Sequence, residues 1–416
     1  MAASTLTTYD ALLFERYIDS SRVEKLMYPD NVLLGLLEKR GDTGMVGSDM
    51  PIPIITKNPQ GAGGAFATAQ TNASAIGASK FATTAGDYYG VVHIGDKVLM
   101  ASRTNAGAFL ENKTTEIDGL WETCAENLSI YAWGNGGGSL GSIASIAGNA
   151  LTLAEPEKIG NFEIDMLVVA SANDGSDSSH SLRTGSDAVD AINRSTGVVD
   201  LDNVADITSL AAGDHLFRQS DFFGDTATIV LKGVQTYITA TDSPMALWGL
   251  TAAARAVDPQ RFAGCRVDSG LLQGKTIEER IKILASQMTG RFKAKMPTAG
   301  FLHPEDFATL DTQLSSRGVR PLEDDSTQFG YMKIDVVCGS GRMPIYTDRH
   351  CPKGTFFALR MEDWWMSSMG EFLHPQTSDG NTVLRRATAT DLEYRLISYP
   401  ILANRAPKNS GRCPLV

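Results

Sequence analysis

A short segment containing glycine, lysine and threonine is the strongest candidate for chemistry in this chain. Gly270, Gly274, Lys275 and Thr276 precede an amphipathic pattern that starts at Ile277, which is the order found in a phosphate-binding loop. Such a loop needs four residues between its glycines so that successive amides surround the phosphates, and here there are three. A turn followed by a helix start is therefore the preferred interpretation. A nucleotide-dependent cytosolic enzyme that uses Lys275 and Thr276 remains an alternative.

Two other patterns could support chemistry, but both have simpler explanations. Residues 136–141 match the dinucleotide-binding glycine spacing, yet they follow a helical pattern where that motif requires a strand. This context favours a linker. His303, Glu305 and Asp306 could form an acid–base cluster. Pro304 directly after His303, with two acidic residues next, is more typical of a strand end and the first turn of a helix.

The cysteines and histidines do not form a recognisable metal-binding or nucleophilic pattern. His350 and Cys351, even together with Cys338, lack the two close ligand pairs of a structural zinc site. The Gly-x-Ser-x-Gly and His-Glu-x-x-His motifs do not occur. We therefore predict no catalytic residue, no cofactor site and no metal site, and we predict that the chain is not an enzyme.

Composition and charge limit the classes of protein further. The chain has 416 residues, of which 43% are hydrophobic, and it contains no apolar run of about 20 residues that could span a membrane. The first residues lack the basic and apolar regions of a signal peptide, so the five cysteines are expected to be reduced. The net charge is −11, without a basic stripe, which argues against sequence-specific binding of nucleic acid.

The negative charge is concentrated in one stretch of the chain. Residues 139–220 carry 4 basic and 12 acidic side chains, a net charge of −8. The same stretch consists of short strand-like runs separated by turns, so we expect a small β-barrel or sandwich inserted into the host fold. The strands are predicted at 150–154, 165–170, 188–194, 197–201 and 214–218.

Ahead of this acidic stretch lies a long segment with few large apolar side chains. Two strand-like runs, 45–56 and 88–100, flank the Gly/Ala/Thr-rich residues 61–80, which cannot build a core of their own. One amphipathic helix is then predicted from about Ser102 to Trp133. Residues 6–40 are expected to be helical in two pieces. A chain with such a sparse arm is expected to order it against copies of itself.

The remainder of the chain shows a mixed pattern of helices and strands. Helices are predicted at 277–292 and 304–314, and a continuous alternating strand at 391–402. Shorter strands are predicted at 299–302, 333–338, 343–346 and 355–359. This order is α+β.

The ordered set of segments resembles the major capsid (coat) protein of tailed bacteriophages, with the Hong Kong 97-like fold and an inserted β-domain. The resemblance rests on Gly213–Asp221, Arg255–Gly264, Phe301–Phe307, Asp348–Thr355, Asp379–Arg385 and Ala403–Pro407, together with the order of arm, loop, long helix and mixed domain. It implies an N-terminal arm (1–42), an extended E-loop (43–99), the spine helix of the P-domain (100–138), the acidic β-insertion (139–221), an A-domain (222–340), returning P-domain strands (341–402) and a C-terminal tail (403–416).

This resemblance implies a structural function in the virion. The chain would assemble in the host cytoplasm into hexamers and pentamers of an icosahedral head that encloses double-stranded DNA. Its partners would be further copies of itself, a scaffolding protein and a portal. A non-viral encapsulating shell of the same fold is the alternative within this class. The side chains expected at contacts between subunits are Phe66, Ile76, Phe81, Tyr88, Tyr89 and Trp121.

Overall fold

The computed structural model describes most of the chain. The described residues are 31–41, 49–95, 106–176, 181–223, 231–242, 245–316, 333–339, 341–370, 372–376, 383–385 and 391–415. Predictions for residues 1–30, and for the exact start of the long helix, lie outside these ranges. Among the described residues, no helix is long and apolar enough to span a membrane.

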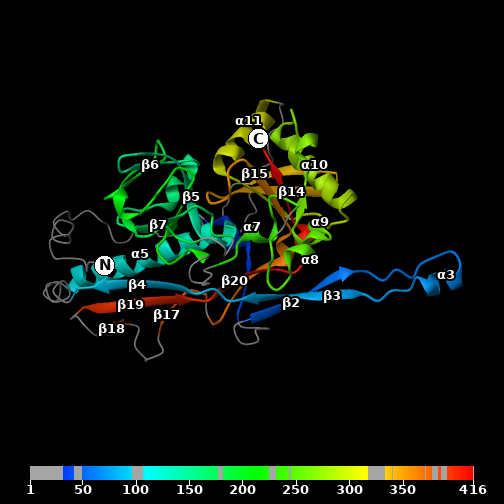
Figure 1. The fold of residues 1–416 in the computed structure, drawn as a ribbon, viewed down its shortest axis with the longest axis horizontal. Helices are drawn as coiled ribbons and strands as arrows, with labels where there is room; N and C mark the ends of the chain where they lie inside the picture. The colour runs from blue at the N-terminus through cyan, green and yellow to red at the C-terminus, as the bar shows by residue number, and fades with distance from the viewer. Residues whose placement is uncertain are drawn as a thin grey trace.

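A long helix lies along the sheet that contains β4 (Tyr88–Ile94) and β19 (Leu392–Ser398) (Figure 1). Helix α5 (Ala106–Trp133) has 28 residues and ends at the glycine run that starts at Gly134. At 1.5 Å per residue it is about 42 Å long. Gly90 lets the helix approach the sheet closely, because a Cβ there would lie 2.6 Å from the Cys124 sulfur. The sheet also contains β17 (His374–Pro375) and β18 (Val383–Arg385).

A six-stranded mixed sheet with two helices packed on it forms a second unit. Its strand order is β11-β21-β15-β12-β14-β13, and α10 and α11 bury their apolar sides in its core. The strands are β11 (Cys265–Arg266), β12 (Ala299–Leu302), β13 (Lys333–Cys338), β14 (Gly341–Thr347), β15 (Thr355–Leu359) and β21 (Gly411–Pro414). The helices are α10 (Ile277–Gly290) and α11 (Pro304–Ser316), preceded along the chain by α7 (Val234–Tyr237), α8 (Ala252–Ala256) and α9 (Pro259–Phe262).

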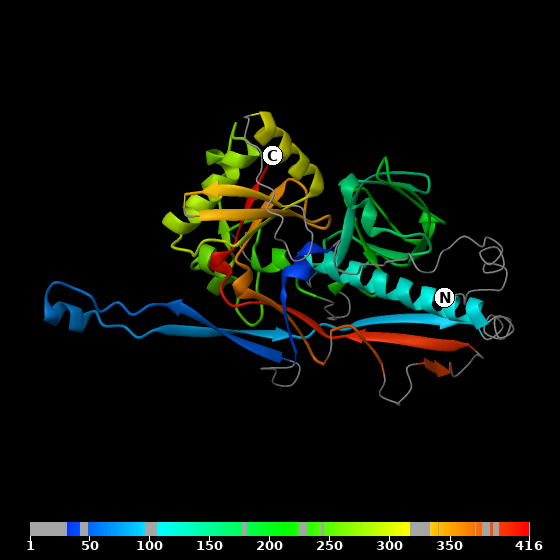
Figure 2. The same ribbon diagram turned by 180° about the vertical axis from the view of Figure 1, so that it is seen from behind.

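A two-stranded ribbon projects far from these units (Figures 1 and 2). Strand β2 (Asp49–Lys57) pairs antiparallel with β3 (Gly77–Thr84), and the connection between them carries the short helix α3 (Phe66–Thr71). Pro51 and Pro53 cannot donate ladder hydrogen bonds, which is tolerated because β2 has only one partner strand.

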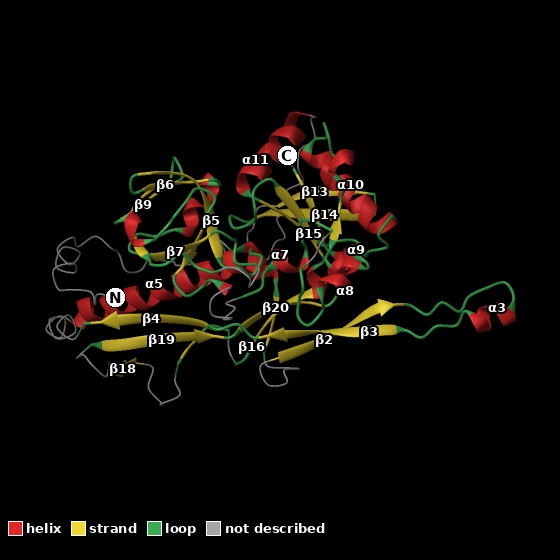
Figure 3. Ribbon diagram, viewed as in Figure 1, coloured by secondary structure: helices red, strands yellow, loops and turns green. Residues whose placement is uncertain are grey.

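The acidic stretch folds into a closed six-stranded barrel beside the upper end of α5 (Figure 3). Its order is β10-β5-β6-β9-β8-β7, so the predicted small β-domain is confirmed as a barrel. The strands are β5 (Ser139–Ala147), β6 (Ala150–Leu153), β7 (Leu167–Ser171), β8 (Asp187–Asn193), β9 (Val198–Leu201) and β10 (His215–Arg218). Strand β5 was not among the predicted strands, since its many small residues weaken the alternation.

A three-stranded sheet ties distant parts of the chain together. After α2 (Val32–Leu36), strand β1 (Glu38–Arg40) pairs in parallel with β16 (Trp364–Ser368), which also pairs with β20 (Pro400–Asn404). The prediction of helix through residue 40 is therefore wrong at its end. The predicted single strand 391–402 is also wrong, because β19 and β20 belong to two different sheets. Pairing with remote strands overrides local propensity in both places.

Two of the predicted domain boundaries do not follow the sheets. Residues 403–416 were named a C-terminal tail, although the last residues were also expected to belong with the A-domain, and β21 lies inside the six-stranded sheet between β11 and β15. The boundary at residue 340 separates β13 from β14, although Cys338 pairs with Gly341 in one antiparallel ladder. Strands that return to a sheet after a long excursion cannot be assigned from local pattern, because their partners are remote in sequence.

The remaining short helices of the described residues are η1 (Pro156–Asn161), η2 (Val204–Asp206), η3 (Ser269–Leu271), η4 (Met361–Asp363) and η5 (Pro407–Asn409).

Candidate assembly surfaces

The glycine–lysine–threonine segment is a plain helix start. Thr276 caps α10 through a reciprocal capping box: its hydroxyl accepts from the Glu279 amide (3.4 Å), and Glu279 Oε2 accepts from the Thr276 amide (3.1 Å). The next amide, of Ile277, donates to Gln313 Oε1 at 3.1 Å. The amides that would surround a phosphate are thus directed at side chains of the chain itself.

The cluster at His303 also has a structural role. His303 directly follows β12 and is buried, and this burial lowers its pKa. Glu305 forms an ion pair with Lys353, and this hydrogen bond lowers the pKa of the carboxyl. Asp306 accepts a hydrogen bond of 2.7 Å from the Gly354 amide. These contacts join the start of α11 to the loop before β15.

The described residues contain no group of three or more His, Cys, Asp or Glu side chains placed to hold a metal ion. All five cysteines are free and buried. Burial raises the pKa of these thiols, to about 11 for Cys124 and about 12 for Cys265 and Cys413. They pack as small apolar side chains with little thiolate character.

The inner half of the ribbon is mostly apolar on both of its faces. Its inward face carries Met50, Ile52, Ile54, Phe81 and Thr83, all of which are buried against the body. The outward face is also mostly apolar. In the observed register Pro51 lies opposite Ala82, Pro53 opposite Lys80 and Ile55 opposite Ala78, so these six residues share one face.

We call these six residues the outward strip: Pro51, Pro53, Ile55, Ala78, Lys80 and Ala82. None of them is buried, and Ile55 is 52% exposed. A surface ribbon that faced only water would normally alternate to polar residues on this side. The outward strip therefore has the composition of a surface that becomes covered by another molecule.

The tip of the ribbon packs on nothing in its own subunit. Residues 58–76 include no buried side chain. Phe66 on α3 is 84% exposed and Ile76 is 54% exposed. The internal contacts of the tip are local, such as the Gln60 amide donating to Ser74 Oγ at 2.9 Å. The tip thus carries large apolar side chains with no core to enter.

The residues predicted at subunit contacts fall into three groups by their exposure. Phe66, Ile76 and Tyr89 are exposed, with Tyr89 at 59%. Trp121 is half-buried against the main core. The other two, Phe81 and Tyr88, are buried within their own subunit.

Phe81 and Tyr88 are held by internal contacts. Phe81 packs edge-on against Tyr237, and the Tyr88 hydroxyl accepts from Asn127 Nδ2 at 2.9 Å. Sequence reasoning had no means to separate them from Tyr89, which is adjacent but faces the other side of the strand. The members of the outward strip were missed, although prolines alternating with isoleucines in 51–55 gave a usable signal.

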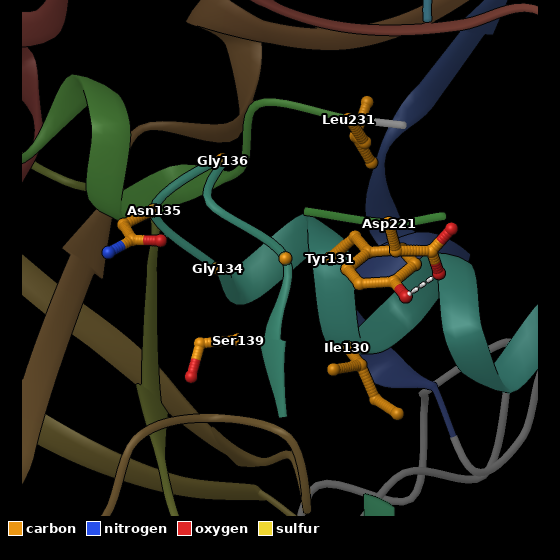
Figure 4. A pocket seen from close by; sticks show the side chains of 9 residues that line it. Ile130, Tyr131, Gly134, Asn135, Gly136, Ser139, Asp221 and Leu231 are labelled. Atoms are coloured by element: carbon orange, nitrogen blue, oxygen red, sulfur yellow. Dashed lines mark hydrogen bonds between the residues drawn. The ribbon is translucent and has the colours of Figure 1, made fainter. Parts of the chain in front are cut away.

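The barrel is joined to the body by a tightly packed junction (Figure 4). The Tyr131 hydroxyl at the end of α5 donates to Asp221, just after the barrel. Asn135 Nδ2 donates to Asp174 Oδ2 at 2.7 Å. A Cβ on Gly137 would lie 2.1 Å from the Asp174 carbonyl oxygen, so a side chain cannot fit there. The cavity at this junction measures about 20 Å³, room for one water molecule at most.

A larger cleft separates the acidic barrel from the body. It has a volume of about 370 Å³, with Glu155, Glu157 and Asp174 on the barrel side and Arg349 and Arg412 on the body side. It is also lined by three histidines, His215, His303 and His350. Burial lowers the pKa of all three, and that of His350 falls to about 3 with a further contribution from nearby Arg349.

Comparison with known proteins identifies the fold. No family model and no curated protein sequence matches this chain. A chain of the cyanophage A-1(L) capsid asymmetric unit superposes with a TM-score of 0.56 and 10% identity, covering 98% of both chains. The chain therefore has the fold of a bacteriophage capsid subunit, with the six-stranded barrel as part of a mixed α+β structure.

Other solved structures superpose less closely. Mycobacterium phage Ogopogo gives a TM-score of 0.42 at 10% identity, covering 92% of both chains. The putative capsid protein of an Escherichia coli CFT073 prophage gives 0.38 at 8% identity, covering 100% of both chains.

Proposed function

We propose that this chain is a major capsid protein that assembles with copies of itself into hexamers and pentamers of an icosahedral head around double-stranded DNA. One observation carries the proposal beyond the fold itself. The ribbon presents an apolar outward strip and an unpacked apolar tip, and both are explained if the ribbon lies on a neighbouring subunit. Ordering a sparse arm costs conformational entropy, which burial between subunits would offset.

The elements correspond to the parts of the Hong Kong 97-like fold in this proposal. The ribbon is the E-loop, and α5 with the β4–β19 sheet forms the P-domain. The six-stranded sheet with α10 and α11 is the A-domain, close to the axes of the capsomers. The acidic barrel projects from the shell, where like charges keep shells apart. A scaffolding protein and a portal are further proposed partners.

The charge of the chain fits storage of DNA in place of tight binding. With a net charge of −11, the protein would bind packaged DNA weakly and without sequence preference. The purified protein is expected not to retard DNA at low salt. Tight, salt-sensitive retardation would contradict this part of the proposal.

The proposal is tested by imaging particles and by one matched pair of substitutions. Expressed protein is separated by sedimentation and examined in negative stain, where capsomers or closed shells are expected. Ile55→Asp places a charge in the outward strip and should prevent assembly, since a charge buried in an apolar contact is costly. Ile164→Asp is the control, because Ile164 is similarly exposed (60%) but lies on the barrel.

Each outcome supports or contradicts one part of the proposal. Assembly of wild type and Ile164→Asp but not of Ile55→Asp would support a ribbon-mediated shell. A wild-type protein that stays monomeric under every condition would contradict the capsid function. Normal shells from Ile55→Asp would contradict the role given to the outward strip.

A further inference from the structure

A strained turn lies at the base of the ribbon. Leu247 and Leu250 exchange two main-chain hydrogen bonds of 2.9 Å, which closes a tight two-residue turn. Its central residues, Trp248 and Gly249, have φ values of 49° and 86°. Positive φ at both positions is the pattern of a type I′ turn, which strongly favours Asn-Gly or Gly-Gly. A bulky aromatic residue at the first position is disfavoured.

The side chain of Trp248 explains why the turn tolerates this conformation. The indole is 8% exposed, and its Nε1 donates to the Tyr237 hydroxyl at 2.9 Å. Lys232 Nζ lies 4.7 Å from the centre of the ring, a cation–π distance. Backbone strain persists where the surrounding contacts over-determine the conformation, as they do here.

The ribbon is held at two points, one on this turn and one on Tyr237 of α7. The carbonyl oxygen of Trp248 accepts a hydrogen bond from the Ala82 amide in β3 at 2.9 Å. Phe81, the neighbouring ribbon residue, packs edge-on against Tyr237 at 6.1 Å between ring centres. Tyr237 is fully buried, and its hydroxyl donates to the Leu402 carbonyl at 2.8 Å. The ribbon base is thus bonded to the turn directly and through a shared tyrosine.

A buried arginine fixes the turn to the rest of the body. Arg255 on α8 is 1% exposed and donates to three main-chain carbonyls: Met245 (2.6 Å), Thr236 (3.1 Å) and Phe262 (3.3 Å). These carbonyls come from the start of the turn segment, from α7 and from α9. Met245 itself is 48% exposed, so the group of contacts that holds the ribbon extends to the protein surface.

We propose that the Trp248 turn is a latch that sets the direction of the ribbon relative to the body and couples it to the α7–α9 region. While the indole is bonded to Tyr237, the ribbon is held in one orientation. A contact that moves the exposed Met245 segment would release or redirect it. The latch itself stands on contacts within one subunit, and only its use during assembly rests on the proposed function.

The latch is tested in dilute, unassembled protein by hydrogen exchange followed by mass spectrometry. Trp248→Asn removes the indole but retains a residue that suits the turn. Tyr237→Phe removes only the shared hydroxyl. Val257→Asn is the control, since Val257 lies between α8 and α9, is 83% exposed and takes no part in these contacts. Peptides from the barrel report general stability.

Amides of residues 49–57 and 77–84 should exchange at least tenfold faster in Trp248→Asn and measurably faster in Tyr237→Phe. Exchange in the barrel and in Val257→Asn should match wild type. Unchanged ribbon exchange in both latch variants would overturn the proposal. An equal rise across the ribbon, the six-stranded sheet and the barrel would also overturn it, because that pattern shows general loss of the core. If Trp248→Asn does not fold, the isosteric Tyr237→Phe decides.

The direction of the ribbon can be measured independently. All five native cysteines are buried, so spin labels can be attached selectively at Gln70→Cys on the tip and Thr309→Cys on α11. The distance distribution between the labels, in labelled protein diluted with unlabelled protein, should be narrow in the parent and broad after Trp248→Asn. A distribution that stays narrow and unshifted would overturn the latch, whether or not the protein forms shells.

Discussion

Replacing residues 58–76 with an Asn-Gly turn should separate the folding of the subunit from its assembly. The deletion joins Lys57 to Gly77, which are paired across the ribbon, so a two-residue turn can close the shortened hairpin. It removes α3, which has no buried residue, together with the exposed Phe66 and Ile76. No contact with the body is lost.

The expected change in subunit stability follows from loop closure. Shortening a loop from about 20 residues to about 2 lowers the entropic cost of closing it by about 2 kcal/mol. The free energy of unfolding should therefore stay constant or rise by up to that amount. If the tip instead packed on its own subunit, removing buried phenylalanine and isoleucine side chains would cost about 1.5–3 kcal/mol each. The two interpretations differ in sign.

Two measurements on the same variant check this reasoning. Chemical denaturation of the dissociated subunit gives its free energy of unfolding, and sedimentation with negative-stain imaging gives its ability to assemble. We expect an equally or more stable subunit that no longer forms shells. A variant that unfolds several kcal/mol more easily would show that the tip belongs to its own subunit. A variant that assembles normally would show that neighbours do not need the tip.

Two further predictions concern the barrel and the cleft beside it. Burial holds the pKa of His350 at about 3, below the 6.5 of an exposed histidine. Between these two pH values the unfolded chain binds a proton at His350 and the folded chain does not. The free energy of unfolding is therefore unaffected by His350 above pH 6.5 and falls as the pH drops below it, by about 1.4 kcal/mol at pH 5.5. Denaturation at pH 7.5 and 5.5 should show that the free energy of unfolding falls by correspondingly less in His350→Gln than in wild type. Gly137→Ala should loosen the junction of the barrel, because the new Cβ would meet the Asp174 carbonyl oxygen. Hydrogen exchange at residues 134–138 and 173–176 should therefore become faster. Gly160→Ala is the control and should leave this exchange unchanged, because the space around its Cβ is open. Equal pH dependence in His350→Gln, or equal exchange in both glycine variants, would refute the respective argument.

The sequence alone predicted those features that depend on neighbours along the chain. A small β-domain, either a barrel or a sandwich, was predicted from the short strand-like runs and turns of the acidic stretch, and only the structure shows that it is a barrel. Helix α5 ends where the glycine run begins, as predicted. Helices α10 and α11 followed from their apolar spacing and from Thr276 and Pro304 at their starts. The scarcity of large apolar residues in 61–80 correctly predicted a segment without a core of its own. For the two helices and for the end of α5 the determining contacts lie within a few residues, whereas the barrel closes through remote pairs such as His215 with Ser142.

Features decided by remote partners could not be read in this way. Strand β1 pairs with β16, which lies more than 300 residues later in the chain. Strand β21 pairs with β11, where Cys265 lies opposite Gly411. The prediction therefore gave helix at Glu38–Arg40, and for the residues after 402 it gave no strand, although it placed the last of them with the A-domain. The local sequence pattern indicates the conformational propensity of these segments, but it does not indicate which strands they pair with.

The same distinction applies to the candidate assembly surface. Composition showed that an arm exists, but not which of its faces meets the body. Tyr88 and Tyr89 are equivalent as residue types, and only the packing of α5 on β4 determines that the first is buried and the second exposed. The outward strip likewise exists because Phe81 and its neighbours turn inward to Tyr237, which fixes the opposite face towards solvent. A strand has two faces with period two, and tertiary packing alone selects between them.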